Sequence, residues 1–145
     1  MLIPDVNILV YAFHEQGDQH VAMRAWLQDA VHGNEAVGLC DAVLVGFLRV
    51  ATLPIWRPPA SLPLAISFIE RLREAPACRH LAPHQRIIGT MLRLCADIRA
   101  SGNIVPDAWL AALAIEHGAT LITADAGFAR FPGLAWKHPL NGRGS

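Results

Sequence analysis

Four aspartates follow short apolar segments of the sequence, and together they suggest a site for chemistry. They are Asp5 after "LIP", Asp41 after "AVGLC", Asp107 after "NIVP" and Asp125 after "ATLITA". Two carboxylates about 4 Å apart repel each other by about 4 kcal/mol at an effective dielectric constant of 20, so a cluster of them needs protons or a cation. Oxygen-only ligand sets favour hard cations such as Mg²⁺ or Mn²⁺, which activate water and stabilise charge on a phosphodiester.

Each of these aspartates also has an ordinary structural explanation, because Asp is a preferred residue at helix N-caps and in turns. Capping is an even alternative for Asp41, and a turn is the alternative for Asp125. Capping explains Asp107 less well, since Pro106 and the extended segment before it already set the helix start. It explains Asp5 least well, because the surrounding sequence is so apolar. The occurrence of all four after apolar segments favours a shared site.

The elements that must position these acids alternate between short apolar segments and helical patterns, which predicts an α/β domain with a mostly parallel central sheet flanked by helices. The carboxyl ends of parallel strands lie along one edge of a sheet, where such proteins bind ligands, so acids distant in sequence are expected to converge there. Helix boundaries are expected at the cap residues Asp18, Ser61 and Gly102. Extended segments are expected at 36–40, 78–81, 103–105, 119–123 and 134–136, and helices at 6–13, about 19–32, 41–52, 61–72, 83–101 and 106–118.

The composition describes one ordinary globular domain, expected at residues 1–140 with a flexible tail at 141–145. The 145 residues are 53% hydrophobic, with 12 basic and 12 acidic side chains, so no overall charge attracts nucleic acid. Three scattered cysteines have no metal-binding spacing and fit free thiols. No signal peptide and no apolar run of about 18 residues is present, so we expect a cytoplasmic protein without a membrane segment.

Three segments match a known family in sequence and in separation. They are "PDVNILVYAF" near the start, "GFLRV" at 46–50 and "PDAWLAALAIEHGATLITADAGFARFPGL" at 106–134. With these segments and its overall length, the chain resembles the PIN-domain ribonucleases, specifically the VapC-type toxins of toxin–antitoxin systems. The resemblance implies a PIN fold, Mg²⁺- or Mn²⁺-dependent cleavage of RNA, a homodimer, and neutralisation by a VapB-like antitoxin.

The resemblance also assigns roles to five residues. Asp5 matches the first metal-binding acid of the family, and Asp107 matches the acid that opens the late helix. Asp125 matches the Asp of the T-x-D motif, with Thr123 as its hydroxyl partner, while Asn7 matches the polar residue that supports the first acid. The expected mechanism is metal-assisted phosphodiester hydrolysis. In it Asp5 and Asp107 bind the ion directly, Asp125 binds it through water or orients the attacking water, and Asn7 and Thr123 hold the carboxylates in place.

Two positions depart from the pattern of the family. Gly46 stands where the family often has Glu, and Gly127 stands where it often has an acid. Asp41 is the candidate that compensates for Gly46, approaching the metal from the strand end or through water. It lies five residues earlier, about one and a half helical turns, and cannot occupy the same place. The candidates for contact with RNA phosphates are Arg49, Arg57 and Arg130.

Two other functions fit parts of the pattern. The first is a non-catalytic PIN module that binds RNA or a protein partner, since Gly46 and Gly127 thin the acidic cluster. The second is a phosphoacceptor receiver or an aspartate-nucleophile phosphatase. A receiver needs paired acids after its first strand and a late lysine, and a phosphatase needs D-x-D. Here Asp5 stands alone, residue 7 is Asn7, and the only lysine is Lys137, so both are disfavoured.

Overall fold

The computed structural model describes residues 1–141, so residues 142–145 of the expected tail lie outside the described part of the chain. No helix within residues 1–141 is long and apolar enough to cross a membrane. The elements in chain order are β1 (Leu2–Pro4), α1 (Val6–Phe13), α2 (His20–Val31), β2 (Val37–Cys40), α3 (Asp41–Ala51), α4 (Leu62–Glu74), β3 (Cys78–Leu81), α5 (Gln85–Ile98), α6 (Ile104–Glu116), β4 (Thr120–Ile122), the 3₁₀ helix η1 (Ala126–Arg130) and β5 (Trp136–Lys137).

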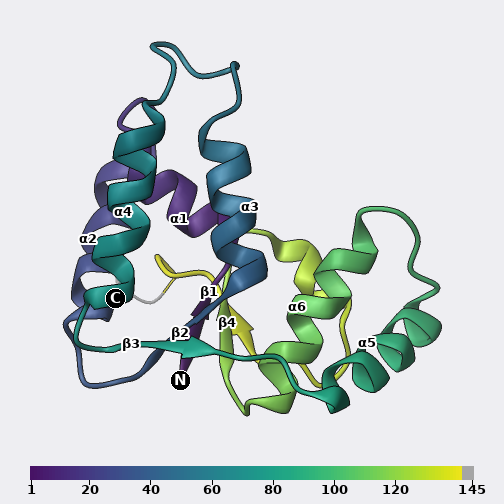
Figure 1. Ribbon diagram of the computed structural model, residues 1–145. Coiled ribbons are helices and arrows are strands. Elements are labelled where there is room, and N and C mark those ends of the chain that lie inside the picture. Colours follow the sequence, from purple (N-terminus) through teal and green to yellow (C-terminus); the bar gives the residue numbers. More distant parts are fainter. Residues whose placement is uncertain (142–145) are drawn as a thin grey trace.

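A five-stranded parallel sheet in the order β3-β2-β1-β4-β5 forms the centre of the protein, which confirms the predicted α/β class (Figure 1). The chain begins in the middle strand, moves outward through β2 to β3, and returns across β1 to form β4 and β5. The strand order therefore reverses between β1 and β4, where Leu2 pairs with Thr120 and Pro4 with Ile122. Ligands of open α/β sheets bind beyond the strand ends at such a reversal.

Two groups of helices surround the sheet. Helices α1 to α4 pack together, while α5 and α6 form a separate pair (Figure 1). Phe13 of α1 lies edge-on to Phe47 of α3 with ring centroids 5.4 Å apart, and Phe68 of α4 completes this aromatic cluster. Helix α6 is buried from Ala108 through Ala114 except at Trp109, because its small side chains let neighbouring elements approach closely.

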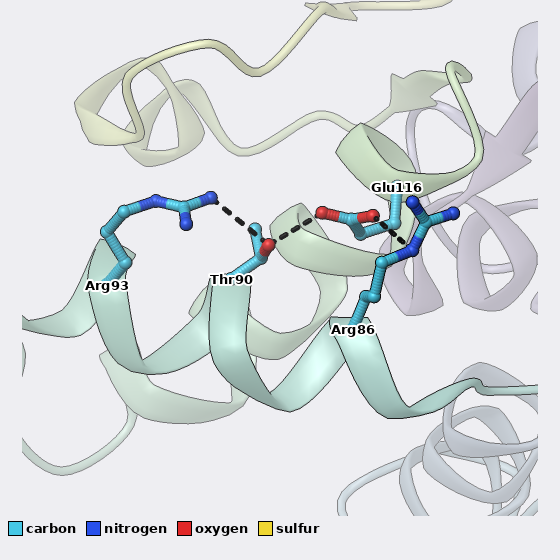
Figure 2. A network of polar contacts seen from close by, with 4 residues as sticks. All are labelled: Arg86, Thr90, Arg93 and Glu116. Carbon is cyan, nitrogen blue, oxygen red and sulfur yellow. Dashed lines mark hydrogen bonds and ion pairs between the residues drawn. The ribbon is translucent and has the colours of Figure 1, made fainter.

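The pair α5 and α6 is joined by a polar network (Figure 2). The Thr90 hydroxyl donates to Glu116 Oε1 at 2.6 Å, and Arg93 donates to the Thr90 hydroxyl at 3.2 Å. Arg86 Nε lies 3.6 Å from Glu116 Oε2. The Thr90 hydrogen bond is the main cause of the lowered pKa of Glu116. Glu116 therefore links two helices, while Asp107 lies nine residues earlier on the same helix.

The segment "NIV" at 103–105 is not extended, contrary to expectation. Ile104 and Val105 form the first turn of α6, and Pro106 is its third residue. The first N–H groups of a helix have no intrahelical partner, so proline is tolerated there and does not require an extended residue before it to begin the helix. Asp107 is therefore presented by the first turn of a helix and does not follow a strand.

Two helix boundaries also differ from the sequence prediction. Helix α2 begins after Gln19, because the turn closed by the His20 N–H on the Gly17 carbonyl leaves Asp18 outside the cap position. Helix α5 ends at Arg99, which itself adopts the left-handed conformation with φ of 53°. Gly102 therefore lies in the following turn and does not end the helix.

Candidate active site

Asp5 occupies the junction between the middle strand and the first helix. It follows β1 directly and caps α1, with Oδ1 accepting the Val6 N–H at 2.7 Å. Its own N–H donates to the carbonyl of Ile122 at 2.9 Å, which fixes the Asp5 backbone against β4. The residue is only 8% exposed. The apolar flanks therefore position the backbone, and the carboxyl group is held at the end of the sheet.

The second oxygen of Asp5 is held by residues from both ends of the chain. Asp5 Oδ2 accepts from the Thr123 hydroxyl at 2.8 Å and from Asn7 Nδ2 at 3.0 Å. The fully buried Thr123 hydroxyl accepts the Asp125 N–H at 3.0 Å, and Asn7 Oδ1 accepts the Ala124 N–H at 3.2 Å. Thr123 and Asn7 thus lie where the sequence prediction expects support for the first acid.

Burial and hydrogen bonding act in opposite directions on Asp5. Burial raises the pKa of the carboxyl group most, and the nearby negative charge of Asp125 raises it further. The hydrogen bonds from Thr123, Val6 and Asn7 favour the ionised form and offset part of this rise. The net pKa remains above the usual aspartate value, so the charged form is held at a cost that a nearby cation would relieve.

Asp107 lies within reach of the Asp5 charge, and it is positioned by the first turn of α6. Within residues 1–141 no hydrogen-bond donor contacts its half-buried carboxyl group. Burial, followed by the charges of Asp5 and Asp125, raises its pKa to about 6, while the charge of Arg130 opposes this rise. The structure therefore brings Asp5, Asp107 and Asp125 into one electrostatic field, as the sequence prediction expects.

Asp125 completes this group from the loop after β4. It caps η1, with Oδ1 accepting the Gly127 N–H at 2.8 Å, and it is exposed to solvent. The 3₁₀ helix itself is not anticipated from the sequence, although an aspartate before a small-residue segment is a recognisable turn signal.

The structure does not bring Asp41 into the group. Its Oδ1 lies 2.9 Å from His80 Nε2 of the edge strand β3, and both side chains are largely exposed. Asp41 does not contribute to the raised pKa values of Asp5 and Asp107. A strand end fixes where a backbone lies but not where its side chain points, and here the Asp41 carboxylate pairs with the neighbouring strand. The expected compensation for Gly46 finds no support in this geometry.

Of the three candidate arginines, Arg130 alone influences the acids. Arg49 is exposed in the last turn of α3, and Arg57 is exposed in the loop that follows. Neither contributes to the pKa shifts of Asp5 or Asp107, whereas Arg130 lowers the pKa of Asp107.

Gly46 faces the start of α1 beside the acid group. A Cβ atom at this position would lie 2.8 Å from Cγ2 of Val6, the residue after Asp5. An acidic side chain at position 46 would therefore lie near the residue that follows Asp5, but only if the stiff side chain of Val6 moved. The position where the family often has Glu is therefore closely packed against Val6 in this chain.

Asp5, Asp107 and Asp125 are the residues that could hold a hard divalent cation that keeps part of its water shell. Within residues 1–141 no group of three or more His, Cys, Asp or Glu side chains forms a ready ligand set. The oxygen donors are nevertheless close enough for Asp5 and Asp125 to raise the pKa of Asp107. Magnesium is commonly bound through one or two carboxylates and several waters, which suits Asp5 and Asp107 with Asp125 nearby.

Comparison with known proteins identifies the family. The model of the PIN domain matches residues 2–134. The chain is also 42% identical to VapC ribonuclease Mb2897 of Mycobacterium bovis over 99% of this chain and 98% of that protein. The chain belongs to the VapC family of PIN-domain proteins. Ribonuclease VapC33 of Mycobacterium tuberculosis is a further VapC relative, 35% identical over 97% of this chain and 99% of its own length.

Solved structures share the PIN fold. VapBC2 of Rickettsia felis, bound to a DNA fragment from its promoter, matches with a TM-score of 0.68 and 18% identity over 94% of this chain and 97% of that chain. VapBC-1 of nontypeable Haemophilus influenzae matches with a TM-score of 0.69 and 19% identity over 95% of this chain and 97% of that one.

The raised pKa of Asp107 predicts an unusual dependence of stability on pH. The folded carboxyl keeps its proton up to about pH 6, whereas the unfolded one loses it near 3.8. Between these values the folded state binds more protons, so the free energy of unfolding decreases as pH rises through this window. The shift corresponds to about 3 kcal/mol, which solvent screening of this half-exposed group reduces to about 1 kcal/mol.

Asp107→Asn is therefore expected to stabilise the metal-free protein by about 1 kcal/mol at pH 7 and to make no difference below about pH 4. Urea unfolding in EDTA from pH 4 to 8 measures this. Asp97→Asn, at an exposed position of α5, is the matched control and should leave the pH profile unchanged. A destabilised Asp107→Asn protein at pH 7 would contradict the cost of the buried Asp107 charge beside Asp5 and Asp125.

Proposed function

We propose that this chain is a metal-dependent endoribonuclease, a VapC-type toxin that hydrolyses RNA and is neutralised by a VapB-like antitoxin. The observation that carries the proposal is the meeting of Asp5, Asp107 and Asp125, which come from three separate segments. Burial, together with the charges of Asp5 and Asp125, raises the pKa of Asp107 to about 6. Several relatives at 33–42% identity are named ribonucleases, which supports RNA as the substrate. The VapBC neighbours support an antitoxin partner, and we propose a homodimer by family resemblance.

In this mechanism Asp5 and Asp107 would hold Mg²⁺ or Mn²⁺. The ion, when bound, supplies an activated water and neutralises charge on the phosphodiester. Thr123 and Asn7 hold Asp5 Oδ2 in one orientation, so the carboxylate does not have to be ordered during the reaction. The Gly127 N–H holds Asp125 Oδ1. Within residues 1–141 the other oxygen of Asp125 has no hydrogen-bond partner, so it would be free to orient the attacking water.

Purified protein, freed of any antitoxin and incubated with RNA in Mg²⁺, in Mn²⁺ and in EDTA, tests the proposal. We expect cleavage with either cation and none in EDTA. Both cations should also raise the melting temperature, because a ligand at 100 times its Kd stabilises the folded state by about 2.7 kcal/mol. K⁺ at equal ionic strength is the control, since a monovalent cation neutralises clustered carboxylates less effectively than a divalent one.

The alternative is a PIN module that binds RNA without cutting it. The glycines at positions 46 and 127, where the family often has acidic residues, favour this alternative. RNA binding without cleavage under any cation would support that alternative and contradict the proposed nuclease.

A further inference from the structure

The side chain of Arg130 is anchored at one end only. Arg130 is the last residue of η1, and its Nε donates to the Gly127 carbonyl at 2.6 Å. This single hydrogen bond fixes the direction of the guanidinium group while the side chain remains exposed to solvent. Within residues 1–141 its terminal nitrogens have no hydrogen-bond partner, although an arginine carries five N–H donors in a rigid fork. The outer edge of the fork is therefore open to a ligand.

The guanidinium group occupies the space that a side chain at position 127 would fill. A Cβ atom on Gly127 would collide with Arg130 Nη2 and would lie 2.8 Å from Asp125 Oδ1. Gly127 does not adopt the left-handed backbone conformation that Gly102, Gly118 and Gly133 adopt. The backbone therefore does not require glycine here, and the absence of a side chain is what admits Arg130.

Arg130 lies beside the acids without being neutralised by them. Its charge lowers the pKa of Asp107. Both Arg130 Nη2 and Asp125 Oδ1 lie close to the position that a Cβ atom of residue 127 would take. Within the described residues Arg130 nevertheless forms no ion pair with Asp5, Asp107 or Asp125. Within residues 1–141 the terminal nitrogens of this cation have no hydrogen-bond or ion-pair partner, so they are arranged for an anion that the acids alone would repel.

We propose that Arg130 binds the non-bridging oxygens of the scissile phosphate, and that Gly127 is the residue that makes room for it. The inference rests on the proposed ribonuclease function. Negative charge grows on these oxygens as water attacks phosphorus and the bond to the leaving oxygen breaks. A guanidinium fork matches two such oxygens, and a preplaced cation stabilises the charge that develops on them. Arg130 forms no covalent bond and keeps its proton throughout.

The test compares Arg130→Lys and Arg130→Gln with the wild-type protein on one RNA oligonucleotide, chosen from a random pool because the wild type cleaves it with Mn²⁺. We expect kcat to fall by about 10²-fold or more in both variants, with KM changed less than about threefold. Mn²⁺ affinity, measured separately, should not weaken, because a positive charge near the acids is removed or moved away. Arg79→Lys is the matched control, since Arg79 is also anchored to backbone carbonyls but lies on the edge strand.

Three further measurements separate phosphate contact from a structural role. Sulfur placed at either non-bridging oxygen of the scissile phosphate should slow cleavage by the wild type. For at least one of the two diastereomers, the same sulfur should slow Arg130→Gln less than it slows the wild type. Gly127→Ala should lower kcat, because its Cβ atom would displace the flexible end of Arg130. The same Cβ atom would lie 2.8 Å from Asp125 Oδ1, so the double variant Gly127→Ala with Arg130→Gln measures the part of the loss that acts through Asp125. Gly127→Ala should slow Arg130→Gln less than it slows the wild type.

The inference is overturned if Arg130→Lys and Arg130→Gln keep the wild-type kcat on an RNA that the wild type cleaves. The inference is also overturned if each of the two sulfur diastereomers slows Arg130→Gln by the same factor as it slows the wild type. A wild-type protein that cleaves no RNA with Mg²⁺ or Mn²⁺ is a different result, because it removes the proposed function and this inference together.

Discussion

Asp5→Asn is expected to abolish RNA cleavage, with a loss of about 10³-fold or more. A metal ion contributes several kcal/mol of charge stabilisation, and each 1.36 kcal/mol is tenfold in rate. The variant should still fold, because the amide oxygen can accept the Val6 N–H that Asp5 Oδ1 accepts at 2.7 Å. Initial rates on labelled RNA with Mn²⁺, together with the melting temperature, measure the two effects separately.

Asp41→Asn is the matched control for Asp5→Asn. Asp41 also follows a strand and begins a helix, but its carboxylate pairs with His80 and is largely exposed. We therefore expect wild-type cleavage from Asp41→Asn. Full activity in Asp5→Asn would contradict the site proposed here, and a large loss in Asp41→Asn would show that Asp41 takes part despite its position.

Thr123→Val is expected to produce the second large effect, although Thr123 carries no charge. The substitution keeps the shape of a fully buried side chain and removes the hydroxyl that donates to Asp5 Oδ2 at 2.8 Å and accepts the Asp125 N–H. The pKa of Asp5 should rise further, because this hydrogen bond is the largest influence that lowers it. We expect Mn²⁺ affinity and cleavage to fall by about 10- to 100-fold, and stability to fall by about 1–3 kcal/mol.

Thr90→Val provides the matched comparison for Thr123→Val. Thr90 is also buried, and its hydroxyl donates to Glu116 at 2.6 Å, but it lies between α5 and α6. This variant should lose stability and keep wild-type cleavage and Mn²⁺ affinity. Equal cleavage by Thr123→Val and Thr90→Val would show that the Thr123 hydroxyl contributes to folding alone.

The sheet and the strand ends that carry Asp5 and Asp125 are predictable from the sequence, for physical reasons that particular residues show. Strands of a parallel sheet are recognisable in the sequence as continuous apolar segments, because both of their faces are buried, as in β2. The carboxyl ends of such strands share one edge of the sheet. Asp5 follows β1 and Asp125 follows β4 at this edge, and Asp107 lies within reach of their charges for a different reason, from the first turn of α6. The prediction from strand ends failed for Asp41, since pairing with His80 depends on strand register across the sheet, which local sequence does not reveal.

The packing around glycines was equally hidden from the sequence. Comparison with the family pattern marks Gly46 and Gly127 as missing acids, but the sequence does not say what occupies each space. Val6 approaches Gly46, and the Arg130 guanidinium fills the space at Gly127. Such contacts depend on side-chain directions between segments far apart in the chain, so they become visible only in the folded structure.

The pairing of the middle strand with β4 also has a consequence during synthesis. Asp5 and the Thr123 that holds it are separated by 118 positions, a stretch that takes a ribosome roughly 6 to 24 s to translate. Until then β1 lacks its β4 neighbour, and neither Thr123 nor Asp125 exists to complete the acid group. A nascent chain is therefore expected to be harmless to the messenger that encodes it, and nuclease activity begins only when translation is nearly complete.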